Sequence, residues 1–140
     1  MQEYLDFFAR HWVLSAAALI LIVLLIATEV SKKLRKFKDI SPAEAARIVG
    51  NDDNLVLDVR EPDEFKSGHL RGAKLIPLGS LAGKLSEIEK FKDKTVLVYC
   101  RSGNRSATAA NILCRAGFSD VSNLAGGIIA WQSEHYPVKK

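Results

Sequence analysis

A long uncharged segment near the N-terminus divides this chain into two parts. From Trp12 to Thr28 the sequence reads WVLSAAALILIVLLIAT, 17 residues without a charged side chain. A helix of this length is about 26 Å long, close to the thickness of the hydrocarbon core of a bilayer. Its apolar side chains lie all round the helix, which disfavours a helix in the membrane plane. We therefore predict a transmembrane helix over residues 12–28, after a short N-terminal segment of residues 1–11.

Two other interpretations of this segment are a cleaved signal peptide and a core helix of a soluble domain. A signal peptide needs a positively charged start and a cleavage site flanked by small residues. Here residues 1–11 carry Glu3 and Asp6 against Arg10, and no A-x-A sequence follows the apolar run. These flanking residues favour the membrane anchor.

A basic segment follows the apolar run directly. It reads SKKLRKFK and contains Lys32, Lys33, Arg35, Lys36 and Lys38. Positive charge close to a transmembrane helix favours the cytoplasmic side, so we expect the C-terminal body to be cytoplasmic. We assign residues 29–38 as a basic juxtamembrane linker that can contact anionic lipid headgroups.

The charges and cysteines of the rest of the chain exclude several classes of function. Residues 39–140 hold fourteen Lys or Arg against thirteen Asp or Glu, so a nucleic-acid-binding surface is not expected. The cysteines, Cys100 and Cys114, do not form a disulfide framework, and no Cys/His spacing predicts a metal site. Free thiols suit a reducing compartment, in agreement with a cytoplasmic body.

The hydrophobic pattern of residues 39–140 predicts an α/β domain. Strands are expected at 54–60, 73–78, 94–100 and from 120, and helices at 41–50, 62–68, 79–91, 104–117 and 128–136. The first helix begins with a capping box, Ser41 with Glu44. The strands are continuous apolar runs, which is typical of a central, mostly parallel sheet with helices on both faces.

The stretch VLVYCRSGNRSATAANIL contains the strongest candidate site. Cys100 ends a predicted strand, where parallel sheets bind ligands, and a helix starts a few residues later. A tight turn at Gly103 can direct backbone N–H groups inward, and two arginines add positive charge. This environment favours a thiolate nucleophile over a buried structural cysteine, the alternative. We predict Cys100 as the catalytic residue and an anion-binding loop of Arg101, Ser102, Gly103, Asn104 and Arg105.

Three motifs in this order resemble those of the rhodanese-type sulfurtransferases. CRSGNRS is similar to their active-site loop, LDVREPDEFKSGHLRGAKLIP to their first signature and NLAGGIIAW to their C-terminal signature. The resemblance covers residues 39–138 and implies a rhodanese domain over that range. The complete layout is similar to that of membrane-anchored, single-domain rhodaneses, which implies a single-pass protein of the bacterial inner membrane.

The resemblance also implies a reaction. Cys100 would take the sulfane sulfur of a small donor such as thiosulfate, become a persulfide, and pass the sulfur to a thiol or to cyanide. Asp58 and Arg60 match family positions that support the loop and the pocket. No cofactor is implied, because the protein itself carries the sulfur.

Two alternatives stay open. The first is a phosphatase or arsenate reductase activity; the related phosphatases use Cys-x5-Arg, whereas Cys100 to Arg105 is Cys-x4-Arg. The shorter loop should make a smaller ring of N–H groups, suited to one sulfur rather than to a tetrahedral oxyanion. The domain could instead be a binding module that docks a membrane-protein partner; the intact cysteine favours the enzyme.

Overall fold

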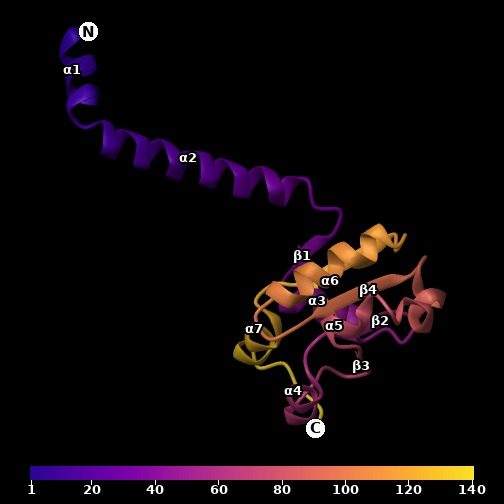
Figure 1. Ribbon diagram of the computed structural model, residues 1–140. Coiled ribbons are helices and arrows are strands. Elements are labelled where there is room, and N and C mark those ends of the chain that lie inside the picture. The colour runs from indigo at the N-terminus through magenta and orange to yellow at the C-terminus, as the bar shows by residue number, and fades with distance from the viewer. The chain divides into compact units, whose positions relative to one another are not determined.

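The computed structural model describes the backbone of residues 1–140 and every side chain except those of Leu5 and Lys32. Its contacts divide the chain into two compact units, Met1–Arg35 and Lys36–Lys140 (Figure 1).

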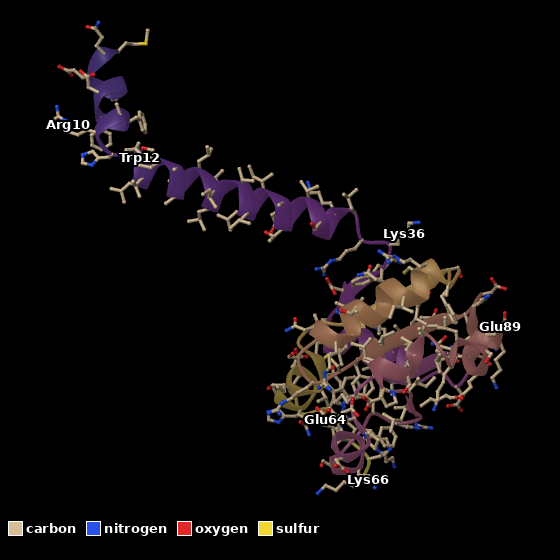
Figure 2. All side chains as sticks on the ribbon, in the orientation of Figure 1. Arg10, Trp12, Lys36, Glu64, Lys66 and Glu89 are labelled. Carbon is tan, nitrogen blue, oxygen red and sulfur yellow. The ribbon has the colours of Figure 1, made fainter. Side chains whose placement is uncertain are left out.

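The first unit consists of two helices, α1 (Gln2–Arg10) and α2 (Trp12–Lys33). Residues Trp12–Ser31 of α2 have a mean hydropathy of 2.6 and are long and apolar enough to cross a membrane, a test that a signal sequence also passes. The side chains of α2 project from all sides of the helix (Figure 2). The helix continues to Lys33, so the first half of the predicted linker 29–38 is helical, and Lys38 already belongs to a strand.

The second unit contains a five-stranded sheet in the order β1-β5-β4-β2-β3. The strands are β1 (Lys38–Ile40), β2 (Leu55–Asp58), β3 (Lys74–Leu75), β4 (Thr95–Tyr99) and β5 (Asp120–Leu124). All neighbouring strands pair in parallel, which confirms the predicted sheet. Strand β1 was not predicted, because this three-residue strand begins with two exposed charged residues and shows no apolar run.

Helices cover both faces of the sheet, as predicted. They are α3 (Pro42–Val49), α4 (Pro62–Ser67), α5 (Leu78–Leu81), the 3-10 helix η1 (Leu85–Phe91), α6 (Asn104–Arg115) and α7 (Gly127–Ser133). Because side chains alternate along a strand, Val96 and Val98 of β4 pack with α5, η1 and α6. Leu97 and Tyr99 face the other way and pack with α3 and α7.

The single helix predicted over 79–91 was wrong. The structure has two short helices there, α5 and η1, separated by residues 82–84. Glycine inside a helix costs about 1 kcal/mol relative to alanine, and Gly83 lies in this interruption. Leu81 and Ile88 are nevertheless both fully buried, so the apolar spacing that suggested one helix is satisfied by two.

The topology brings three loops to one edge of the sheet. Strands β2, β4 and β5 are parallel neighbours in the order β5-β4-β2, so their carboxyl ends, at Asp58, Tyr99 and Leu124, lie at the same edge. The loop after β4 leads directly into α6, and the loop after β5 leads into α7 (Figure 1). The candidate site is built where these connections meet.

Candidate active site

The turn after Cys100 depends on a glycine. Gly103 has a φ of 101°, in the left-handed region that favours glycine, and it caps the N-terminus of α6. A Cβ atom at this position would lie 3.4 Å from both the Gly126 nitrogen and the Leu124 oxygen. In this conformation the Gly103 N–H donates a hydrogen bond to Cys100 Sγ, at 3.1 Å.

The surroundings of Cys100 favour its thiolate form. The residue is buried, with only 1% of its surface exposed, and Ser106 Oγ lies 3.4 Å from Sγ. Burial alone would raise the pKa of the thiol. Hydrogen bonds from the Ser106 hydroxyl and from the N–H groups of Ser106, Gly103 and Ser102 outweigh this effect, so the pKa of Cys100 is lowered. The thiolate is the form in which a cysteine acts as a nucleophile, so this geometry suits Cys100 to that role.

The buried Asn123, a residue that was not predicted as part of the site, holds Ser106 in place. The Ser106 hydroxyl donates to Asn123 Oδ1 at 2.5 Å, and Asn123 Nδ2 donates to Asp39 Oδ1 at 2.9 Å and to Gly103 O at 3.3 Å. The hydroxyl has a single proton, so it can turn from Asn123 toward the sulfur when the sulfur is charged. The available signal was polar residues at buried positions: Asn123 near the end of a strand and Ser106 in the first turn of a helix.

Arg105 is tied to α4. Its two terminal nitrogens each donate a 2.8 Å hydrogen bond to the carboxylate of Glu64. Arg105 thereby lowers the pKa of Glu64 to about 2 and has its own pKa raised by the same pairing. Arg105 was predicted as part of the anion-binding loop, but the two terminal nitrogens of its guanidinium bind Glu64, so it joins the start of α6 to α4.

Asp58 and Arg60 form a buried ion pair at the end of β2. Arg60 Nη2 lies 2.6 Å from Asp58 Oδ2 and also donates to the carbonyl oxygen of Gly68 at 2.7 Å. Burial opposes the charge on Arg60, but its hydrogen bonds and attraction to Asp58 raise the pKa overall, so the guanidinium stays charged. The Arg60 guanidinium lies 5.4 Å from the ring centre of Tyr99, the residue before Cys100.

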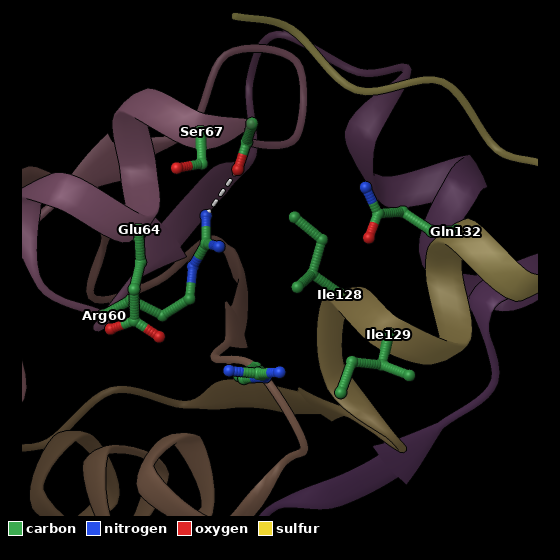
Figure 3. Close-up of a pocket in the computed structure, with 8 residues that line it drawn as sticks. Arg60, Glu64, Ser67, Ile128, Ile129 and Gln132 are labelled. Atoms are coloured by element: carbon green, nitrogen blue, oxygen red, sulfur yellow. Dashed lines mark hydrogen bonds between the residues drawn. The ribbon is translucent and has the colours of Figure 1, made fainter.

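A cavity of about 290 Å³ opens beside the loop. Arg60 lies on one side, and Ile128, Ile129 and Gln132 of α7 lie on the other (Figure 3). Arg101 lines the cavity, whereas Cys100 is not among the lining residues. Of the predicted site residues, Ser102 and Gly103 lie in the turn after Cys100, Asn104 is the first residue of α6, and Arg101 is exposed.

The match to a known family agrees with this geometry. A family model described as "Rhodanese-like domain" matches residues 41–134. The chain belongs to the rhodanese family.

Relatives extend this match over the complete chain. The uncharacterized protein YibN of Escherichia coli K12 is 37% identical over 139 residues, which cover 99% of this chain and 97% of that protein. A sulfurtransferase of Allochromatium vinosum is 38% identical over 98 residues, covering 70% of this chain and 90% of that protein. The crystal structure of a rhodanese-related protein from Thermoplasma volcanium is similar, with a TM-score of 0.66 and 36% identity, over 74% of this chain and 98% of that one.

In this rhodanese the motif NLAGGIIAW binds the backbone of the loop that begins at Cys100. The N–H groups of Ile128 and Ile129, at the start of α7, donate to the carbonyl oxygens of Cys100 and Arg101 at 2.9 and 3.2 Å. Gly127 has a φ of 60°, and a Cβ atom on it would overlap both of these carbonyl groups. The second glycine of NLAGG is thus needed because the loop backbone passes directly against it.

We predict that Gly127→Ala destabilises the fold much more than Gly72→Ala. Both glycines have similar left-handed φ values, 60° and 69°, but a Cβ on Gly72 would meet nothing within 4 Å. Gly72→Ala should cost about 1 kcal/mol of backbone strain, and Gly127→Ala about 2 to 4 kcal/mol because of the added overlap. Urea unfolding of the full chain in detergent measures both losses, and equal losses would contradict the packing argument.

Proposed function

We propose that this protein is a sulfurtransferase that carries sulfur as a persulfide on Cys100. The observation that carries the proposal is the ring of hydrogen bonds on Cys100 Sγ, which favours a thiolate at the end of β4. The relative from Allochromatium vinosum, which is named a sulfurtransferase, supports the same class of reaction.

The reaction needs two displacements at sulfur. The Cys100 thiolate attacks the sulfane sulfur of a donor such as thiosulfate, the donor's S–S bond breaks, and sulfite leaves with the electron pair. An acceptor thiolate or cyanide then attacks the outer sulfur of the persulfide, and the Cys100 thiolate leaves. Both leaving and entering groups are anionic, which the N–H groups around Cys100 stabilise.

The neighbouring residues support these steps in different ways. The N–H groups of Ser102 and Gly103 and the Ser106 hydroxyl stabilise negative charge on sulfur. Exposed Arg101 attracts the anionic donor to the loop. Arg105, held by Glu64, braces the loop rather than binding the donor.

The Arg105–Glu64 pair argues against the phosphatase alternative. A phosphatase of this architecture needs the loop arginine to hold the phosphate oxygens. Here both terminal nitrogens of Arg105 are bound to Glu64, in addition to the shorter loop noted above. Sulfur chemistry is therefore the better supported function.

We further propose that α2 anchors the protein in the bacterial inner membrane and leaves the rhodanese domain in the cytoplasm. The proposal is supported by the length and hydropathy of α2 and by the basic residues that follow its apolar part. The match to the Escherichia coli relative also includes the N-terminal helices, since it covers 99% of this chain.

Thiosulfate should add one sulfur atom to the protein at Cys100. The full chain in detergent is incubated with thiosulfate, freed of donor and weighed intact. We expect the added sulfur to be absent from Cys100→Ser and retained in Cys114→Ser, because burial raises the pKa of Cys114. No adduct, together with no thiocyanate from added cyanide, would instead favour a binding module.

Reporter fusions test the orientation. An enzyme that is active only outside the cytoplasm should be inactive at the C-terminus and active at the N-terminus. The reverse pattern would contradict the orientation derived from the basic segment.

A further inference from the structure

The cavity beside the loop is larger than thiosulfate requires. Its volume of about 290 Å³ is near the lower limit for sites that bind small organic molecules. Thiosulfate has only five heavy atoms, and the N–H groups around Cys100 already provide for its sulfur. The cavity therefore has room for a larger ligand.

One wall of the cavity presents a buried cation. Arg60 is only 4% exposed; its Nε and Nη2 donate to Asp58 and Gly68, and Tyr99 is a further side-chain partner of the guanidinium. Arg60 also lines the cavity, so a ligand there can approach its charge. A guanidinium that faces a cavity favours a ligand with an anionic acceptor oxygen.

The net charge of the cavity lining is positive. The charge of Arg60 is balanced by Asp58, and that of Glu64, another lining residue, by Arg105. Arg101 also lines the cavity and forms no ion pair within the part of the chain that the structure describes. One uncompensated positive charge, on Arg101, beside the guanidinium of Arg60 is suited to a carboxylate.

The opposite wall is apolar. Ile128 and Ile129 line it, and Ile129 is 48% exposed, the one exposed large hydrophobic residue among the described side chains of the unit Lys36–Lys140. A ligand with a short aliphatic segment would cover this side chain and remove apolar surface from water. The Ile128 N–H donates to the carbonyl oxygen of Cys100, so this wall adjoins the backbone of the residue that carries the thiol.

We propose that this cavity binds the organic acceptor of the sulfur, a small aliphatic thiol that carries a carboxylate. The carboxylate lies against Arg60 and Arg101, and the carbon chain lies on Ile128 and Ile129. The inference rests on the proposed function. In the transfer step the acceptor thiolate attacks the outer sulfur of the Cys100 persulfide, the S–S bond to Sγ breaks, and Cys100 leaves as a thiolate. The product is an organic persulfide, and no other oxidant or reductant is needed.

Two thiols of matched chain length test the proposal. The full chain in detergent is loaded with thiosulfate, freed of donor and mixed with 3-mercaptopropionate or with 3-mercapto-1-propanol. Loss of the added sulfur is followed by intact mass, and each rate is expressed per thiolate. We expect 3-mercaptopropionate to react about 10-fold faster at low concentration, as one charge-assisted hydrogen bond would provide. Equal rates would overturn the proposal.

Variants assign the selectivity to the cavity. Arg101→Gln should reduce the rate ratio to within about 3-fold of unity, whereas Arg115→Gln, a matched change of an exposed arginine on α6, should preserve it. Ile129→Glu should slow 3-mercaptopropionate more than 3-mercapto-1-propanol, because it places a carboxylate in the apolar wall. A ratio that is unaffected by both Arg101→Gln and Ile129→Glu would contradict the assigned site.

A binding measurement separates this inference from the proposed function. Saturation-transfer NMR on the unloaded protein should show binding of butyrate but not of butyramide, and Arg101→Gln should abolish the butyrate signal. Butyrate binding without any sulfur adduct would support the cavity and contradict the proposed sulfur transfer. Sulfur loading without selectivity for butyrate or for 3-mercaptopropionate would support the proposed sulfur transfer and contradict the acceptor site in the cavity.

Discussion

The hydrogen bonds that converge on Cys100 Sγ are the interaction on which the site depends. A buried thiol would ordinarily resist ionisation, since removing a charge from water is costly. In this protein the loop backbone and the Ser106 hydroxyl replace water as hydrogen-bond donors, so the pKa falls although the residue is buried. In the proposed reaction the negative charge moves one atom further out, onto the outer sulfur of the persulfide.

The surrounding fold keeps these donors in position. Gly103 sets the turn, Asn123 from β5 holds both Ser106 and the Gly103 carbonyl, and the start of α7 binds the carbonyl oxygens of Cys100 and Arg101. Each contact comes from a different element at the carboxyl edge of the sheet. The loop backbone is therefore fixed in advance, and only the Ser106 hydroxyl has to turn when charge forms on sulfur.

Most of the sheet and the loop after Cys100 could be predicted from the sequence. The side-chain contacts that join these elements mostly could not. The parallel sheet followed from continuous apolar runs, and the loop from a strand, a cysteine and a glycine before a helix. Strand β1 could not be predicted because its partner β5 lies about eighty residues away and its own residues are charged. The Arg105–Glu64 pair and the Asn123–Ser106 bond likewise join residues that are distant in the chain, 41 and 17 positions apart. The pattern of residue types within a short stretch of sequence does not show which distant residues will meet.

The pKa of Cys100 tests the central claim most directly. The ultraviolet absorbance of the thiolate is measured against pH for the full chain, and the titration of Cys100→Ser is subtracted. The account predicts a midpoint below about 8.5, the ordinary value for cysteine, and a higher midpoint in Ser106→Ala. A midpoint at or above 8.5, or one that Ser106→Ala leaves unchanged, would contradict the claim that these hydrogen bonds hold Cys100 as a thiolate.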